Sequence, residues 1–244
     1  MRKRIGLTLS ETVVSAAIIA IMIAVAIPVV QVLQESMHSS GARSMISGAL
    51  AAARALAAKH QKYAGIRFQY DPNGHNQYMI FILHDPSISA SGFRAIEGLK
   101  PIKLPENLGV MDLRLTRGDE KRTPSDDPIN SDLQLAPPND ENALKDTTTF
   151  SIIFSPSGKL LIQEVRVIRT STTDRIFNDL NTTDAMFQED SYLDIPLRQE
   201  WSRNSFVIYN KKEFSKIDED SRWTDYLMHL DVLYINPYTG TIIE

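Results

Sequence analysis

The chain has 244 residues, of which 43% are hydrophobic and 23% are charged, a composition ordinary for a globular protein and too apolar for a disordered one. It contains no cysteine, which excludes a disulfide scaffold, a cysteine-ligated zinc site, an iron–sulfur cluster and a cysteine nucleophile. The net charge of −4 argues against a general nucleic-acid binder, so no nucleic-acid partner is expected.

Charge divides the chain into a basic N-terminal arm and an acidic body. Residues 1–62 have seven basic and two acidic side chains, a net charge of +5. Residues 63–244 have 19 basic and 28 acidic side chains, a net charge of −9. We expect the basic arm and the acidic body to have different functions.

The N-terminal arm contains an apolar segment long enough to cross a membrane. Residues 13–30 include no charged side chain, and eighteen such residues reach the length of a spanning helix. Three basic residues at positions 2–4 place the start of the chain in the cytoplasm by the positive-inside rule. The apolar segment is longer than the core of a secretory signal peptide, and no clear small-residue cleavage site follows it. The sequence therefore predicts a membrane-spanning segment with the body on the outer side.

The residues before this segment form a motif, RKRIGLTLSE, from Arg2 to Glu11. The motif resembles the type III signal of type IV pilins and pseudopilins, in which a basic leader ends in Gly and Glu is the fifth mature residue. The resemblance implies that a prepilin peptidase cuts between Gly6 and Leu7 and that the new amine of Leu7 is methylated. Ser10 departs from the family pattern, as does Thr12, because apolar residues are usual at both positions.

Glu11 lies at the head of the apolar segment. A carboxylate at bilayer depth is costly and suggests a functional partner, whereas at the headgroup boundary it is cheap, so position alone leaves both interpretations open. The resemblance implies that Glu11 pairs with the Leu7 ammonium of a neighbouring subunit, which would relieve two buried charges and set the register of a filament. Pro28 matches the position of a helix-bending proline in many of these proteins.

The helix is predicted to continue beyond the membrane as an amphipathic helix. Apolar side chains recur there at helical spacing. The resulting organisation is a leader at 1–6, a transmembrane or filament-core helix at 7–33, an amphipathic continuation at 34–62 and a globular head at 63–244. The apolar side chains form two adjacent stripes, one of Met45, Ala49, Ala52 and Leu56 and one of Ile46, Leu50, Ala53 and Ala57.

After residue 63 the apolar period changes from helical to alternating, which predicts a β-rich head. Many short strands separated by Pro- and Gly-containing turns favour an antiparallel sheet packed on the helix, hence an α+β fold. One helix is expected in the head, at Ser221–Asp231. The expected strands are Gly65–Asp71, Gln77–His84, Val110–Thr116, Phe150–Phe154, Leu160–Ile168, Ser205–Tyr209, Val232–Ile235 and Thr241–Ile243.

Residues 117–148 have a different composition, with four prolines, eight acidic side chains and few large apolar ones. We expect a long surface loop here. Its acidic pairs, Asp126–Asp127 and Asp140–Glu141, have the oxygen ligands that calcium takes, but no EF-hand spacing is present. A solvated loop is the preferred interpretation.

The head has a second, weaker resemblance to a family of known proteins. The AARALA sequence of Ala52–Ala57 followed by the strand Ile66–Tyr70 is similar to the H-type minor pseudopilins of type II secretion. The FSPSG turn at Phe154–Gly158 is similar to them as well. This likeness implies a β-sandwich-like globular head on the long N-terminal helix.

No catalytic constellation is evident in the sequence. The five histidines make no metal-ligand spacing, and neither a Gly-x-Ser-x-Gly elbow nor a phosphate-binding glycine loop is present. No catalytic residue, metal or cofactor is therefore expected. Each histidine is interpreted as structural or solvated: His38, His60, His75, His84 and His229.

Together these features predict a non-catalytic minor pseudopilin of a type II secretion pseudopilus, a filament for protein export. It would sit in the bacterial inner membrane as a single-pass protein with a cytoplasmic N-terminus and a periplasmic head, and then join the pseudopilus. Its expected partners are prepilin peptidase, other pseudopilins or pilins in a hetero-oligomeric filament, the inner-membrane assembly platform and the membrane. One alternative is a minor pilin of a type IV pilus or competence filament, and another is a membrane-anchored enzyme or receptor.

Overall fold

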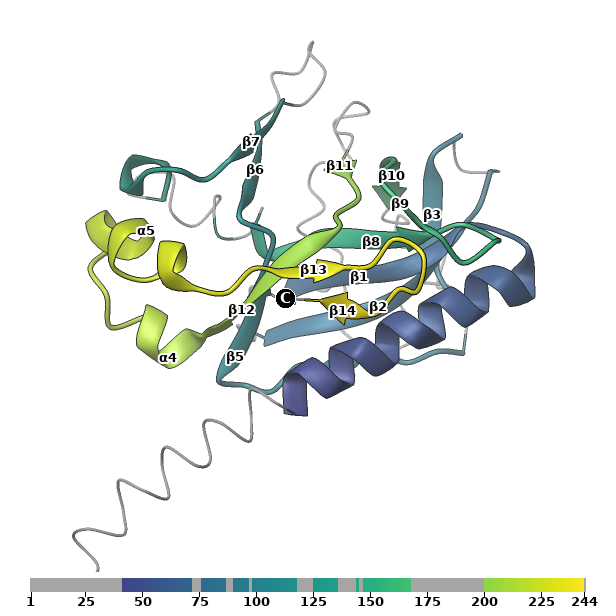
Figure 1. Ribbon diagram of the computed structural model, residues 1–244, viewed down its shortest axis with the longest axis horizontal. Coiled ribbons are helices and arrows are strands. Elements are labelled where there is room, and N and C mark those ends of the chain that lie inside the picture. Colours follow the sequence, from purple (N-terminus) through teal and green to yellow (C-terminus); the bar gives the residue numbers. More distant parts are fainter. Residues whose placement is uncertain are drawn as a thin grey trace, which may run out of the picture. The chain divides into compact units, whose positions relative to one another are not determined.

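A computed structural model describes residues 41–71, 76–86, 90–96, 98–117, 125–135, 144, 147–167 and 200–243. These residues form an α+β fold in which an N-terminal helix, residues 41–60, packs on a largely antiparallel sheet (Figure 1). No helix in the described part of the chain is both long enough and apolar enough to cross a membrane. The predicted span at residues 7–33 lies outside the described residues.

The helix buries one stripe of small and medium apolar side chains. Ile46, Leu50, Ala53 and Ala57 are fully buried, as the helical spacing predicts. The neighbouring predicted stripe is divided, because Met45 and Leu56 are partly buried while Ala52 is exposed. A helix of this kind derives most of its stability from the packing of its apolar face.

The larger sheet has eight strands: β1 (Ala64–Asp71), β2 (Asn76–His84), β3 (Gly92–Ala95), β4 (Ile102–Lys103), β8 (Phe150–Phe154), β9 (Leu160–Leu161), β10 (Glu164–Val167) and β11 (Glu200–Trp201). Their order is β11-β10-β3-β2-β1-β8-β9, with β4 added to β2. All pairings are antiparallel except that of β10 with β3. The strands predicted at Gly65–Asp71 and Gln77–His84 are confirmed as β1 and β2, which form a hairpin with Asp71 paired to Asn76 at its closed end.

A second sheet has four antiparallel strands in the order β14-β13-β12-β5. A separate two-stranded ribbon pairs β6 with β7. The strands of the second sheet are β5 (Leu108–Met111), β12 (Ser205–Asn210), β13 (Leu233–Ile235) and β14 (Ile242–Ile243), and those of the ribbon are β6 (Arg114–Arg117) and β7 (Ser125–Pro128).

One apolar core joins the helix to both larger sheets. Along β1, alternate residues point to the helix, and Ile66 and Phe68 are fully buried in this core. Phe206 of β12 belongs to the same core, and its ring centroid lies 6.1 Å from that of Phe68. Gly65 lies on the opposite face, where an added Cβ would come within 2.1 Å of the Ile152 carbonyl oxygen. Close approach of β8 to β1 therefore requires glycine at this position.

The prediction of one continuous strand at Val110–Thr116 is wrong. The chain forms β5 and then β6 in different sheets, with a break at Asp112 and Leu113. Leu113 has a φ of 55°, a left-handed conformation that ends a strand. The apolar alternation continues across the break, so it gave no sign of the turn. The predicted strand Leu160–Ile168 is similarly divided into β9 and β10.

The helix predicted at Ser221–Asp231 is broken into short turns. The chain forms α5 (Arg222–Asp225) and then a 3₁₀ turn, η4 (Leu227–His229). Between them Tyr226 has φ −139° and ψ −63°, outside the helical region. Two further short helices precede this segment, α4 (Lys211–Phe214) and η3 (Glu219–Ser221). We call residues 211–230 together with the 3₁₀ turn η1 (Asp132–Gln134) the helical unit.

Part of the expected loop 117–148 has regular structure. It contributes β7 and η1, and its Ile129 and Leu135 are 3% and 0% exposed. Both pack in an apolar cluster with Met111, Val207 and Leu227. The pair Asp140–Glu141 lies outside the described residues. Ile129 and Leu135 thus anchor the described portion of this segment in the core of the head, while Leu133 between them is exposed.

Candidate functional site

The residues predicted to carry function in the N-terminal arm are Gly6, Leu7, Glu11 and Pro28. All four lie outside the described residues, so their roles remain predictions. The described part of the chain instead shows how the helix is joined to the head and how the head is held together.

Arg54 fastens the helix to two turns of the head. Its Nε donates to the Gly158 carbonyl at 2.9 Å, and its two terminal nitrogens donate to the carbonyls of Thr239 at 2.9 Å and Tyr238 at 3.1 Å. Gly158 ends the β8–β9 turn, while the other two carbonyls belong to the β13–β14 turn. The planar guanidinium has five N–H donors and can bond three carbonyls that lie in different directions. A lysine ammonium makes such a set of bonds poorly. We call this contact the Arg54 clamp.

Two glycines make room for the clamp. Gly158 has a φ of 77° and Gly240 a φ of 70°, conformations that side chains with a Cβ rarely adopt. A Cβ on Gly158 would also lie 2.8 Å from the Arg54 Nε. The turn predicted at Phe154–Gly158 is confirmed, and the glycines of this turn and of the β13–β14 turn also leave room for the Arg54 side chain.

Removing the clamp should loosen the helix from the head. We expect Arg54→Ala to lower the free energy of unfolding by about 1–3 kcal/mol, because three carbonyls lose a charged donor. Arg54→Lys should recover only part of the loss. Urea unfolding followed by circular dichroism measures both. Lys59→Ala, a change at an exposed cation on the same helix, should leave stability nearly unchanged; an equal loss there would contradict a specific role for the clamp.

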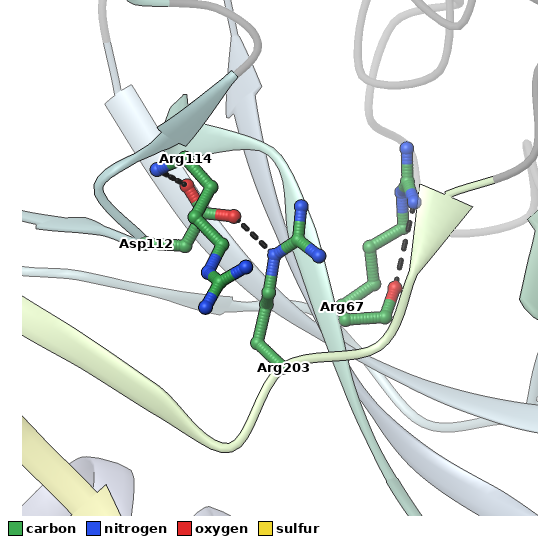
Figure 2. A network of polar contacts seen from close by, with 5 residues as sticks. Arg67, Asp112, Arg114 and Arg203 are labelled. Carbon is green, nitrogen blue, oxygen red and sulfur yellow. Dashed lines mark hydrogen bonds and ion pairs between the residues drawn. The ribbon is translucent and has the colours of Figure 1, made fainter. Parts of the chain in front are cut away.

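A buried ion pair lies where β5 leads into β6 (Figure 2). The Arg203 Nε donates to one carboxylate oxygen of Asp112, and the side chains are 6% and 1% exposed. The other carboxylate oxygen accepts the backbone N–H of Arg114 at 3.1 Å. Arg203 itself is fixed through its backbone N–H, which donates to the Ser151 carbonyl at 2.7 Å. The ion pair therefore connects the segment between β5 and β6 to β8 of the larger sheet.

Arg67 brings a further buried cation to this region, as Figure 2 shows. It lies on the face of β1 that points away from the helix and is 3% exposed. Its Nε donates to the Gln69 Oε1 at 2.8 Å, and a terminal nitrogen lies 3.5 Å from the Ser151 hydroxyl oxygen. The far face of the larger sheet is thus polar at its centre, beside an apolar cluster that includes Ile80, Ile82 and Ile153.

Gln77 links the two larger sheets through its side-chain amide. Its Nε2 donates to the carbonyls of Val110 at 2.8 Å and Thr148 at 2.6 Å. Its Oε1 accepts the backbone N–H of Val110 at 2.7 Å. A single side chain, 1% exposed, thereby bonds to both backbone groups of one β5 residue as a neighbouring strand would. Every donor and the acceptor of this buried amide are satisfied.

Asp132 attaches η1 to the start of α5. Its carboxylate accepts the backbone N–H groups of Trp223 at 2.7 Å and Thr224 at 3.0 Å, as well as the Thr224 hydroxyl. The Thr224 hydroxyl bond is the main reason that the pKa of Asp132 lies below its ordinary value of 3.8, and the two N–H groups add to it.

This lowered pKa gives a pH-dependent prediction. The contribution of Asp132 to stability should be fully present above about pH 4 and should disappear as the pH falls through the lower, folded-state pKa. The stability difference between the wild-type chain and Asp132→Asn should therefore be constant from pH 7 to about pH 4 and shrink below it. Urea titrations between pH 3 and 7 measure this difference, with Asp225→Asn on α5 as control. A difference that grows on acidification would be the wrong sign.

Among the residues that the structure describes, three other titratable groups have shifted pKa values. Burial raises the pKa of the Tyr209 hydroxyl, and burial also raises that of Tyr226. Burial, together with the positive charge of Lys103, lowers the pKa of Lys211 to about 8. These groups surround the join between β12 and α4, and burial is the largest cause of each shift.

The described histidines lie apart from one another in the fold. His84 contacts the rings of Tyr63 and Phe93 edge-on, and one of its ring nitrogens lies 3.0 Å from the Ala90 carbonyl oxygen. His60 is exposed at the end of the helix, and His229 lies in η4. Among the described residues, no group of three or more histidine, aspartate or glutamate side chains could hold a metal ion. His38 and His75 lie outside these residues.

The polar core was missed by the sequence interpretation. Arg67 and Gln69 alternate with apolar residues in a strand, a pattern typical of a solvent-facing side. The only signal that could have predicted a buried polar face is that several such residues occur in strands that turn out to be central in the sheet. The Arg54 clamp was missed as well, because its acceptors are backbone carbonyls of distant turns.

Comparison with known proteins gives no assignment. No family model matches the chain, and neither a curated protein nor a solved structure does.

Proposed function

We propose that this chain is a non-catalytic, pilin-like filament subunit, of which a minor pseudopilin of type II secretion is the best-supported form. The observation that carries the proposal is the motif from Arg2 to Glu11, in which a basic leader, Gly6, Leu7 and Glu11 occupy the positions of a prepilin signal. The apolar segment that follows is long enough to hold the subunit in the inner membrane before assembly.

The fold of the described residues supports the proposal. A filament subunit of this type needs a helix that is firmly joined to its head, because the two must move together during assembly. The helix at 41–60 has a fully buried apolar stripe and is fastened by the Arg54 clamp to the β8–β9 and β13–β14 turns. Two sheets share one core with the helix, which is compatible with the β-sandwich-like head implied by the resemblance.

The remaining steps of the proposal follow from the motif. Prepilin peptidase would remove residues 1–6 and methylate Leu7, after which the chain would join other pseudopilins through its N-terminal helix at the assembly platform. The bend at Pro28 would shape that helix, and the head would face the periplasm. None of these steps calls for a cofactor on this chain, since the methyl group transferred to Leu7 comes from a methyl donor that acts with the peptidase. A type IV pilus or competence filament would use the same signal, while a membrane-anchored enzyme or receptor would use the N-terminus only as an anchor.

The intact mass of the chain tests the proposal most directly. Produced beside its prepilin peptidase, the chain should lose Met1–Gly6 and gain one methyl group on Leu7. Gly6→Ala is expected to block both changes and serves as the control for specific cleavage. An uncut chain, or a cut after the apolar segment, would show the N-terminus to be a plain anchor or secretion signal.

Glu11 gives the test of assembly. We expect Glu11→Ala to abolish incorporation into filaments while processing at Gly6 continues, because the pairing partner of the Leu7 ammonium is lost. Glu35→Ala is the matched control, since Glu35 is the other acidic residue of the N-terminal arm. Cross-linking in membranes and recovery in sheared filaments measure incorporation. Unchanged assembly of Glu11→Ala would refute the proposed pairing.

A further inference from the structure

We call residues 211–230 of the helical unit the flap, because they cover part of one face of the second sheet. Val207 and Tyr209 of β12 belong to an apolar cluster that is separate from the core beneath the helix. Phe214 and Leu227 of the flap pack in the same cluster. In Figure 1 the α4 and α5 segments of the flap lie together at one end of β12, apart from the helix.

The flap is weakly embedded in the head. The structure describes all of its residues, and among them only Phe214, Arg222 and Leu227 are buried. The backbone hydrogen bonds that close its turns join residues three or four positions apart, as in the bond from the Ser215 N–H to the Lys211 carbonyl. A segment with few buried apolar side chains and local hydrogen bonds opens at a lower free energy than a core strand does.

Arg222, one of the buried side chains, disfavours the closed position of the flap. It is 9% exposed, and its Nε and one terminal nitrogen have no hydrogen-bond partner among the described residues. The other terminal nitrogen lies 3.5 Å from the Glu219 carboxylate, and the guanidinium carbon lies 4.9 Å from the centre of the Phe214 ring. Buried donors without a partner cost free energy, which water returns when they are exposed. Arg222 therefore stores free energy that favours opening.

Two polar contacts hold the flap closed. The Asp132 carboxylate accepts the backbone N–H groups of Trp223 and Thr224 at 2.7 and 3.0 Å. The Tyr226 hydroxyl accepts the backbone N–H of Asn210, at the start of α4, at 2.9 Å. Both contacts use side chains rather than strand pairing, so the flap can leave without breaking the ladders of β12 with β5 and β13.

We propose that the flap is a hinged lid, which opens as one unit while the second sheet stays folded. Its hinges lie where it leaves β12 and where it enters β13. Opening hydrates the Arg222 guanidinium and uncovers Val207 and Tyr209, which are 0% and 6% exposed when the lid is closed. The lid thus controls access to an apolar face of the head. The inference rests on the packing of the head and is independent of the proposed role in a filament.

Hydrogen exchange of the full-length chain in detergent micelles, followed by mass spectrometry of its peptides, tests the lid. Peptides from the flap should have protection factors about a hundredfold lower than peptides from β12. Their exchange should also depend less on urea, because opening the lid exposes less surface than global unfolding does. Equal protection and equal urea dependence in the flap and in β12 would overturn the proposal.

Two variants move the lid in opposite directions. Arg222→Met keeps a stem that packs on the Phe214 ring but removes the unpartnered donors, so the protection of the flap should rise several-fold while that of β12 stays nearly constant. Asp132→Ala removes a latch and should lower the protection of the flap by about tenfold, again with little change in β12. Lys212→Met, at an exposed cation of the same flap, is the control and should change neither. Lower flap protection in Arg222→Met, or equal changes in the flap and β12 in both variants, would overturn the proposal.

Discussion

Replacing Asp112 by alanine is expected to lower the free energy of unfolding by about 3–5 kcal/mol, the usual cost of removing one partner of a buried ion pair. The Arg203 guanidinium would remain in the core, 6% exposed, without the carboxylate that faces it. The backbone N–H of Arg114 would lose its acceptor as well. Chemical denaturation monitored by tryptophan fluorescence measures the loss.

Two further variants separate the ion pair from simple packing. Asp112→Leu combined with Arg203→Met should be less destabilising than either single change, because neither charge of the pair is then buried. Glu106→Ala breaks an exposed pair, in which the Lys103 ammonium lies 3.1 Å from the Glu106 carboxylate, and should cost less than about 1 kcal/mol. A double variant as unstable as the sum of its parts would show that the two side chains act independently.

The second large effect is expected at Gln77. Gln77→Leu removes the side-chain partner of three buried backbone groups and should lower the free energy of unfolding by about 3 kcal/mol or more. Gln77→Glu should cost still more at neutral pH, because a carboxylate would face the carbonyl oxygens of Val110 and Thr148 in place of the amide N–H groups.

Acidification distinguishes the two Gln77 variants. When the carboxyl group introduced by Gln77→Glu is protonated, it regains one donor, so this variant should recover stability relative to Gln77→Leu as the pH is lowered. Gln61→Glu is the matched control, since the Gln61 amide is exposed and donates to the nearby Ala58 carbonyl. Equal effects of Gln77→Glu and Gln61→Glu would mean that the link between the sheets contributes nothing.

The apolar periodicity of the sequence predicted much of the α+β framework. The helix through residues 41–60, β1, β2, β8, β12 and the β13–β14 hairpin all follow from it, because each has one face in the core and a turn at its end. The predictions failed where the backbone turns inside an apolar run. At Leu113 and Tyr226 the local conformation is imposed by tertiary packing, which apolar spacing does not report.

The polar contacts that hold the head together could not be predicted from the sequence, for a different reason. Gln77 bonds to Val110, Arg203 pairs with Asp112, and Asp132 binds the start of α5. In each case the partners are separated by 33 residues or more, and no local pattern links them. The N-terminal motif is the opposite case: its residues are adjacent in the chain, so the sequence alone carries the hypothesis.

The Arg54 clamp also constrains the order in which the chain can fold. Its acceptors at Tyr238 and Thr239 lie 184 and 185 residues further along the chain, so the clamp cannot form until almost all of this sequence has been synthesised. Contacts between such distant residues slow folding, because a long loop must close before they form. Until the clamp forms, only the apolar contacts between its stripe and the earlier strands hold the helix, which leaves the nascent subunit more exposed to misfolding.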